Sequence, residues 1–209
     1  MKADRWSLEI LQSRGLEPLV SILAGGGVAI LPTDTIYGLH ARAADDRAVR
    51  RIFAIKGRPE EKSLVVICGS IAQLDGLGVT VDGPVLDALG KLWPASLTAV
   101  LPIARPLPAS AGELTLAIRV PGLEWLRAVV NRTGPLVSTS VNASGEAPVI
   151  SPEQVPPAIG NRVDLIVDGG TLNGQPSTIV DFTESSPRVL REGAFAFTQN
   201  LWKTVWKSL

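Results

Sequence analysis

The hydrophobic positions of this chain fall into many short runs separated by glycine, proline and polar residues. Residues 28–31 follow three glycines and end at Pro32, a pattern that predicts a short buried strand. Residues 115–120 and 136–142 alternate between apolar and polar positions, which predicts strands with one buried face. Further strands are predicted over residues 64–68, 97–101, 164–167, 178–181 and 189–191.

Apolar residues at helical spacing separate these strands. Asp45 predicts the N-cap of a helix that ends at Lys56-Gly57, just before Pro59. Further helices are predicted over residues 6–14, 85–92, 123–131 and 198–209. The last of these carries Trp202 and Trp206 on one stripe, which favours a helix packed on the body over a partner-binding site. Strands and helices mixed in this order predict an α/β domain of two or three layers built on one twisted sheet.

The composition is that of one folded globular domain, expected to span residues 1–209. The chain is 45% hydrophobic with a mean hydropathy of +0.24, which excludes global disorder. Twenty Lys and Arg residues balance twenty Asp and Glu residues, so a protein that mainly coats nucleic acid is not expected. The single cysteine, Cys68, rules out an intrachain disulfide. No apolar run approaches the ~18 residues of a membrane span, so a cytoplasmic protein is expected.

Polar side chains line one face of two predicted strands. Thr115 and Arg119 share a face of the first strand, and Ser138, Ser140 and Asn142 share a face of the second. Burying such a face without partners is costly. The face is therefore either solvated, as in an ordinary half-exposed strand, or the floor of a polar pocket.

Three cations, Lys56, Arg58 and Lys62, lie within seven residues at the exit of the predicted helix. Together with the polar strand faces they suit phosphate, because arginine contacts it in a bidentate manner and lysine supplies a point charge. Charges that follow a helix are most often solvated surface, so spacing alone leaves both interpretations open.

Other chemistries have weaker support in the sequence. The only histidine, His40, has no cysteine near it in the chain, so no zinc-ligand spacing exists. The phosphate-loop signature, the dinucleotide glycine fingerprint and the Gly-x-Ser-x-Gly elbow are also missing from the sequence. We expect His40 to be a packing or surface residue and Cys68 to lie in the core.

Eight short motifs, in the same order, resemble those of the YrdC-type threonylcarbamoyl-AMP synthases. The resemblance runs from about residue 16 to 195, and the chain resembles the short, single-domain form of the family. The motifs are Leu31-Pro-Thr-Asp-Thr-Ile-Tyr-Gly-Leu39 (PTDTxYGL), Lys56-Gly-Arg-Pro59 (KGRP), Trp93-Pro-Ala-Ser-Leu-Thr98 (WPGPLT), Arg119-Val-Pro121 (RxP), Ser138-Thr-Ser-Val-Asn-Ala-Ser-Gly145 (STSANxSG), Asp168-Gly-Gly170, Pro176-Ser-Thr178 and Arg191-Glu-Gly193.

The resemblance implies a twisted mixed sheet flanked by helices, with a large positively charged cleft. It also implies an enzyme that joins L-threonine, bicarbonate or CO2, and ATP into threonylcarbamoyl-adenylate and pyrophosphate. The product would feed N6-threonylcarbamoyl modification of the adenosine next to the anticodon in tRNAs that read ANN codons. Proteins that transfer the threonylcarbamoyl group to tRNA are the implied partners, and direct tRNA binding is expected to be weak.

The resemblance also assigns roles to individual positions of this chain. Lys56 and Arg58 would act in catalysis and, with Lys62, would hold the triphosphate. The full ATP-binding set is Lys56, Arg58, Lys62, Thr115, Ser140, Asn142 and Arg191, and the threonine-binding set is Thr35, Arg119, Ser138 and Ser177. No metal site of the protein is expected, and Mg2+ would arrive with ATP because no carboxylate cluster offers a cage.

A few positions depart from the family pattern. Lys62 stands where the long form often has asparagine, and Ile67 stands where it has a histidine that contacts threonine. Ala95-Ser96 replaces Gly-Pro in a turn, which we expect to shift the turn geometry. Val141 replaces a small alanine and is expected to repack the core.

Two alternative functions are compatible with parts of the pattern. An RNA-binding module would use the basic cleft without catalysis and would bind tRNA in a salt-sensitive manner. A carbamoyl-adenylate enzyme of the hydrogenase-maturation type would carry acylphosphatase-like and zinc segments, which this sequence lacks.

Overall fold

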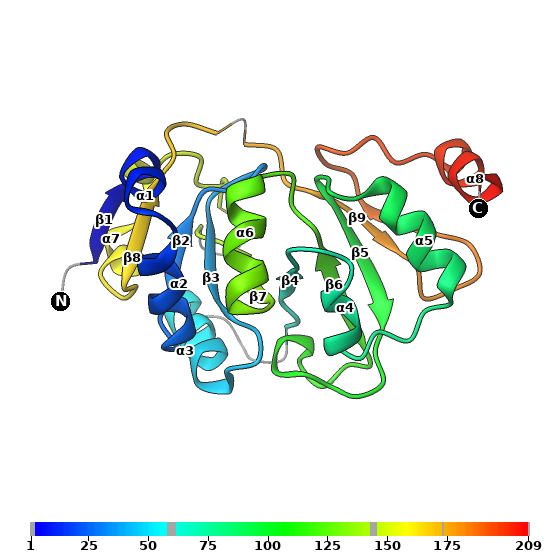
Figure 1. The fold of residues 1–209 in the computed structure, drawn as a ribbon, viewed down its shortest axis with the longest axis horizontal. Helices are drawn as coiled ribbons and strands as arrows, with labels where there is room; N and C mark the ends of the chain where they lie inside the picture. Colours follow the sequence, from blue (N-terminus) through cyan, green and yellow to red (C-terminus); the bar gives the residue numbers. More distant parts are fainter. Residues whose placement is uncertain (1–2, 58–61, 143–145, 173, 209) are drawn as a thin grey trace.

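A computed structural model describes residues 3–57, 62–142, 146–172 and 174–208, and Figure 1 shows its fold. The strands are β1 (Asp4–Ser7), β2 (Ala29–Leu31), β3 (Gly38–Arg42), β4 (Val65–Ile67), β5 (Leu97–Pro102), β6 (Thr115–Arg119), β7 (Leu136–Ser140), β8 (Leu165–Asp168), β9 (Thr178–Asp181) and β10 (Arg188–Arg191). The helices are α1 (Leu8–Arg14), α2 (Glu17–Ala24), α3 (Asp46–Lys56), α4 (Gln73–Gly76), α5 (Gly83–Leu92), α6 (Glu124–Thr133), α7 (Pro157–Gly160) and α8 (Gln199–Lys207), with short 3-10 turns at Pro108–Ser110 and Pro152–Gln154.

All the strands named above belong to one mixed sheet. Their order is β1-β8-β2-β3-β7-β4-β6-β5-β9-β10, so strands close in the sequence are often far apart in the sheet. The sheet contains parallel pairs, such as β4 with β6 and β5 with β9, and antiparallel pairs, such as β3 with β7. Strand β1 and helix α8 lie at opposite ends of the molecule (Figure 1). The predicted α/β fold with one twisted, mixed sheet is thereby confirmed.

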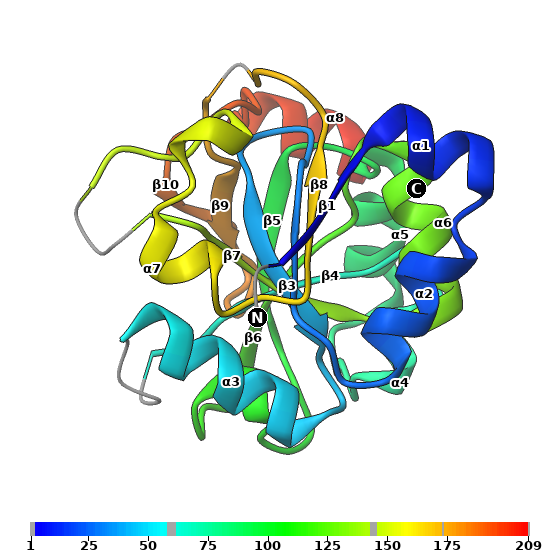
Figure 2. The same cartoon turned by 90° about the vertical axis from the view of Figure 1, so that its left-hand side faces the viewer.

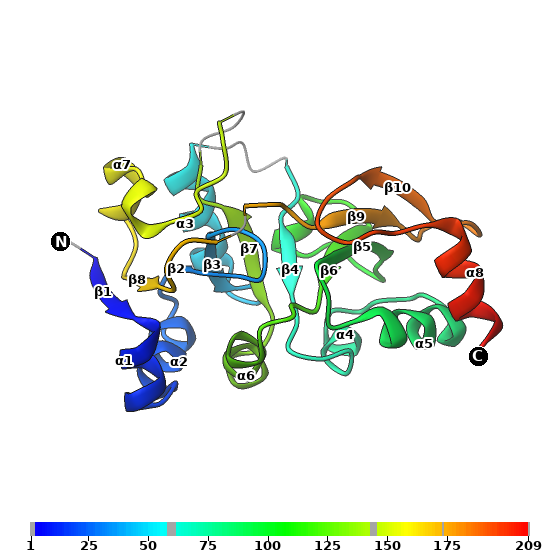
Figure 3. The same cartoon turned by 90° about the horizontal axis from the view of Figure 1, so that it is seen from above.

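Helices cover both sides of the sheet. A smaller core, which includes Leu19, Leu126 and Leu136, packs β2, β7 and β8 against α2 and α6. A larger core, which includes Ile52, Leu89 and Ile118, contains the buried sides of α3 and α5 and spans most of the sheet. Figure 3 shows α3 and α7 on the opposite side of the strands from α2 and α6.

Local sequence signals fix the ends of α3. Asp45 accepts a hydrogen bond from the amide of Ala48 at 3.0 Å, as expected of an N-cap. Gly57 ends the helix in the left-handed conformation with φ of 56°, which glycine adopts without a steric penalty. The predicted helix bounds are therefore confirmed, and Lys56 is placed in the last helical turn.

Strands β1 and β3 were not predicted from the sequence pattern. Residues 6–14 were expected to be helical, but the segment divides into β1 and α1, with the Ser7 hydroxyl capping the helix. Strand β3 carries His40 and Arg42 among apolar residues, so its alternation is hidden. The strands β1, β8, β2 and β3 follow one another at one edge of the sheet, and Figure 2 views the molecule from this end.

The C-terminal helix packs on the body, as its stripe predicts. Trp202 of α8 is buried, and its ring centroid lies 5.1 Å from that of Phe182. Trp206 stacks at 5.4 Å on Trp202 and stays 43% exposed. A hollow of about 680 Å³ lies beside these two tryptophans. Within the described residues, no helix is both long and apolar enough to span a bilayer.

Candidate functional site

A cavity of about 510 Å³ opens over the middle of the sheet. Its floor consists of residues that share one face of six neighbouring strands, among them Gly38, Val65, Ala117, Ser138 and Ile179. The loops that follow β2 and β7, and the segment before β9, form its walls. The cavity therefore collects side chains from most of the motifs of this sequence.

The structure brings most of the predicted site residues together. Those that line this one cavity are Thr35, Arg119, Ser138, Ser140, Asn142, Ser177 and Arg191. The polar faces predicted on residues 115–120 and 136–142 could have been a solvated surface or the floor of a pocket. At Arg119 and Ser138 they form the floor of the pocket. The functional roles of these residues remain predictions.

The other predicted site residues lie beyond the lining of the cavity. Lys56 is half-buried at the end of α3, and its ammonium donates to the backbone carbonyls of Ser140, at 2.7 Å, and of Asn142. Lys62 is exposed and precedes Ser63, which lines the cavity. Thr115 lies one step beyond Ala117 on the same face of β6 and does not line the cavity. Arg58 lies outside the described residues.

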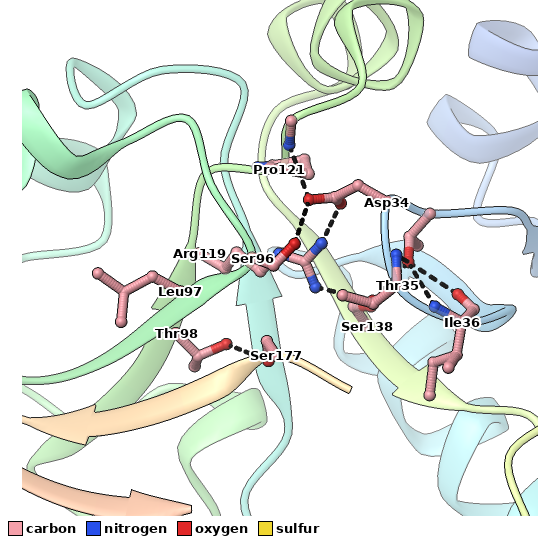
Figure 4. A network of polar contacts seen from close by, with 12 residues as sticks. Asp34, Thr35, Ile36, Ser96, Leu97, Thr98, Arg119, Pro121, Ser138 and Ser177 are labelled. Carbon is pink, nitrogen blue, oxygen red and sulfur yellow. Dashed lines mark hydrogen bonds and ion pairs between the residues drawn. The ribbon is translucent and has the colours of Figure 1, made fainter. Parts of the chain in front are cut away.

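Arg119 is held at the cavity wall by the loop that follows β2 (Figure 4). Its guanidinium forms an ion pair with Asp34 and donates to the hydroxyl of Thr35 at 3.0 Å. Asp34 also accepts from the Ser96 hydroxyl at 3.1 Å and from the amide of Gly122 at 3.0 Å. One carboxylate thus joins three segments of the chain and fixes the direction in which Arg119 points.

Arg119 is unusually buried for an arginine, at 6% exposure. Burial lowers the pKa of its guanidinium, the neighbouring charge of Asp34 raises it, and the charge of Arg191 lowers it again. Burial also lowers the pKa of Arg191. Within the described residues, the Nε of Arg119 has no hydrogen-bond partner. Arg191 is more exposed than the ion-paired Arg119, and the positive charges of the two arginines that line one cavity favour an anionic ligand there.

The second arginine is fixed by the segment that precedes β9. Arg191 donates to the Ser177 carbonyl from Nε at 3.2 Å and from Nη2 at 2.7 Å. The Ser177 hydroxyl forms a hydrogen bond with that of Thr98 at 2.8 Å (Figure 4). At Gly193, a Cβ atom would lie 2.3 Å from the carbonyl oxygen of Pro176, so only glycine allows the chain to pass this close. The last two motifs therefore form one packed unit.

The first motif packs on the Asp168-Gly-Gly170 motif through Tyr37. The buried Tyr37 hydroxyl donates to the Gly170 carbonyl at 2.7 Å and accepts from the Gly169 amide at 3.0 Å. A Cβ atom on Gly169 would lie 2.7 Å from Cγ of Pro32, which explains the glycine at this position. These contacts hold the loop that carries Asp34 and Thr35, and they show a structural reason for two of the eight motifs.

The departures from the family pattern are placed as follows. Ile67 lines the cavity as a buried apolar residue and offers no hydrogen bond there. The Ser96 hydroxyl supports Asp34, so the altered turn adds a polar contact to the site. Val141 is buried in the larger core, as expected.

Two site residues were missed by the sequence analysis. Asp34 lies inside the first motif, yet its role as the partner of Arg119 depends on a contact between residues 85 positions apart. His40 was expected to be a packing or surface residue, and its complete burial confirms that it packs in the interior, but its contact with the cavity lining was not foreseen. It lies beside the cavity floor, where it contacts Ser138. Cys68 lies in the core as predicted, and burial raises the pKa of its thiol to about 12.

The fold and the cavity define an α/β protein with a polar ligand site on one face of a mixed sheet. A family model described as "Telomere recombination", for the Sua5, YciO and YrdC proteins, matches residues 21–193. The chain therefore belongs to this family, and the resemblance carried by its motifs is confirmed.

Known proteins of this family resemble the chain over most of its length. The threonylcarbamoyl-AMP synthase of Pyrococcus abyssi is 36% identical over 172 residues, which are 80% of this chain and 51% of that protein. The crystal structure of Pyrococcus abyssi Sua5 complexed with L-threonine matches with a TM-score of 0.82 and 30% identity, over 92% of this chain and 58% of that one. The crystal structure of Escherichia coli YciO matches with a TM-score of 0.82 and 27% identity, over 94% and 98% of the two chains. The chain thus spans little more than half of the Pyrococcus protein and nearly all of YciO.

Proposed function

We propose that this protein is a threonylcarbamoyl-AMP synthase, which forms L-threonylcarbamoyladenylate and pyrophosphate from L-threonine, bicarbonate or CO2, and ATP. The observation that carries the proposal is the convergence of Arg119, Arg191 and the 138–142 strand face on one cavity. Family membership and the name of the Pyrococcus relative support the same reaction.

The proposed reaction depends on positioning of the substrates and on charge stabilisation more than on covalent catalysis by the protein. The amine of threonine takes up CO2 to give a carbamate, one carbamate oxygen attacks the α-phosphorus of ATP in line, and pyrophosphate leaves. Holding the two reactants in register lowers the barrier, and cations stabilise the charge that develops on the phosphoryl oxygens. A cavity lined by hydroxyls and guanidinium groups suits this reaction.

Threonine and nucleotide would occupy neighbouring parts of the cavity. Arg119, oriented by Asp34, would bind the threonine carboxylate beside Thr35, Ser138 and Ser177. Arg191, Ser140 and Asn142 would face the nucleotide, and Thr115 would contact it from the far end of β6. Lys56, Arg58 and Lys62 would bring positive charge to the triphosphate, with Lys56 and Arg58 stabilising the transition state.

The metal requirement and the partners follow from the substrates. ATP would enter as its Mg2+ complex, and the described residues contain no group of three or more His, Cys, Asp or Glu side chains that would form a separate cage. The adenylate would pass to the proteins that transfer the threonylcarbamoyl group to tRNA in the cytoplasm, with only weak direct binding of tRNA to this protein.

Pyrophosphate release under omission of single substrates tests the proposal. Release is expected only when L-threonine, bicarbonate and MgATP are all present, and the reaction should yield one threonylcarbamoyl-adenylate per pyrophosphate. Arg58→Ala and Arg191→Met should each lower the rate by at least about tenfold, because each removes a positive charge assigned to ATP binding. Equal release without threonine would contradict the proposal.

A further inference from the structure

His40 is buried beside the cavity, on the same face of the sheet as Gly38 and Ser138, and bridges two strands of its floor. In the antiparallel pair of β3 and β7, His40 lies directly opposite Ser138. The imidazole Nδ1 lies 2.9 Å from the Gly38 carbonyl oxygen, and Nε2 lies 3.1 Å from the Ser138 hydroxyl. A Cβ atom on Gly38 would lie 2.7 Å from Cε1 of His40, so the missing side chain at Gly38 makes room for the ring.

These contacts fix which imidazole nitrogen carries the proton. A carbonyl oxygen only accepts hydrogen bonds, so Nδ1 must be the protonated nitrogen and donate to Gly38. Burial, with the charge of Arg119 in addition, lowers the pKa of His40 to about 4, and the ring is therefore neutral near pH 7. In the neutral ring, Nε2 has a lone pair and no proton.

The hydroxyl of Ser138 must then donate its only proton to Nε2. Toward a ligand in the cavity, which Ser138 lines, the hydroxyl then has only lone pairs to offer. Without His40, the hydroxyl proton could rotate toward the ligand, and Ser138 could serve as a donor or as an acceptor.

We propose that His40 is a positioning residue that makes Ser138 a dedicated hydrogen-bond acceptor for a donor group of the amino-acid substrate. The inference rests on the proposed function, because it takes threonine as the occupant of this part of the cavity. Both the ammonium and the hydroxyl of threonine are donors of the required kind, whereas its carboxylate is excluded from this contact. His40 thereby sets the polarity of the amino-acid site and, with it, the orientation in which threonine binds.

A double-mutant cycle on threonine affinity, measured by titration calorimetry of the full chain, tests the inference. His40→Asn keeps a group near the position of Nδ1 and removes the acceptor at Nε2, whereas His40→Gln keeps an acceptor near Nε2. His40→Asn and Ser138→Ala should each weaken threonine binding by about tenfold, and His40→Gln by less than about threefold.

The double variant is expected to bind threonine no more weakly than Ser138→Ala alone, because His40 acts through Ser138. If the double variant instead binds threonine about a hundredfold more weakly than the wild type, the two residues act independently and the inference is overturned. Threonine binding by the wild-type chain would still leave the proposed function intact. Absence of threonine binding by the wild type would instead refute both proposals.

Titration with L-2-aminobutyrate, which lacks the hydroxyl, identifies the donor group. If the coupling between His40 and Ser138 vanishes with this ligand, the threonine hydroxyl is the donor. If the coupling persists, the donor is the ammonium. If His40→Asn does not fold, the threonine affinity of His40→Gln relative to the wild type tests the same point. A loss of threonine affinity of tenfold or more in His40→Gln would overturn the inference.

Discussion

Asp34 and Arg119 form an ion pair that is almost wholly removed from water. Their side chains are 14% and 7% exposed, and the carboxylate is also hydrogen-bonded to Ser96 and Gly122. A buried pair of this kind contributes less net stability than its contacts suggest, because both charges lose their hydration. The ion pair instead fixes the position of the Arg119 guanidinium at the cavity.

Removing the negative charge of Asp34 tests how the burial of this ion pair affects stability. Asp34→Asn leaves the buried Arg119 without a counter-charge and is expected to lower the free energy of unfolding by about 3 kcal/mol, as measured by urea denaturation. Glu17→Gln, which breaks the exposed pair with Arg132, provides the control and should change stability by less than about 0.5 kcal/mol. Equal effects of the two variants would contradict the role assigned to burial.

The single histidine makes part of the pH dependence of stability attributable to one side chain. The pKa of His40 is about 4 in the folded chain, against 6.5 for an ordinary histidine, so between these values only the unfolded chain binds the proton. The contribution of neutral His40 to the free energy of unfolding is therefore fully present above pH 6.5. The free energy of unfolding should fall by about 1.4 kcal/mol per pH unit as the pH decreases from 6.5 toward 4.

Denaturation of the wild type and of His40→Gln at pH 7 and pH 5 measures this effect. The wild type should lose about 2 kcal/mol more than the variant between the two values, because the variant has no histidine to protonate. A loss of the same size in both proteins would assign the pH dependence to other groups.

Gly193 lies where the closing motif crosses the segment before β9, and a methyl group there would meet backbone atoms of Pro176 and Ser177. Gly193→Ala should therefore lower the free energy of unfolding by about 2 kcal/mol and displace Arg191, with a loss of ATP affinity by calorimetry. Gly76→Ala in α4 is the matched control, since its added methyl meets no atom within 4 Å. Retention of full ATP affinity by Gly193→Ala would contradict the packing described here.

Arg188 and Arg191 lie on the same strand and allow a charge-matched comparison. Arg191 lines the cavity, whereas the side chain of Arg188 is 70% exposed and pairs with Asp181. Arg191→Met is expected to weaken MgATP binding by at least about tenfold, and Arg188→Met by less than about twofold. Since both changes remove one positive charge, a similar loss in the two variants would point to a non-specific electrostatic effect.

The sequence predicted most of the elements whose apolar positions are periodic or whose ends carry strong signals. The α3 helix, with Asp45 at its start and Gly57 at its end, is an example. Strand β3 was missed because both of its faces are buried, and the polar His40 lies on one of them. Two-residue periodicity predicted the polar faces of β6 and β7 but not what covers them, and only the resemblance to the family assigned their residues to a site.

What the sequence could not supply was the partners of these residues. The contact of Asp34 with Arg119 and that of His40 with Ser138 join segments 85 and 98 positions apart, through a sheet order that crosses back several times. A local pattern contains no information on such pairing. Seven of the residues that the motifs predicted for the site line one cavity, and the sheet topology brings them together.

The central claim is that one cavity holds an amino acid beside a nucleotide. Calorimetric titration of L-threonine, with and without a saturating non-hydrolysable ATP analogue and Mg2+, tests it most directly. The account predicts that threonine binds at least about fivefold more tightly with the analogue present, and that the analogue binds more tightly by the same factor in threonine, as linkage requires. Identical threonine affinity in the two titrations would contradict the claim.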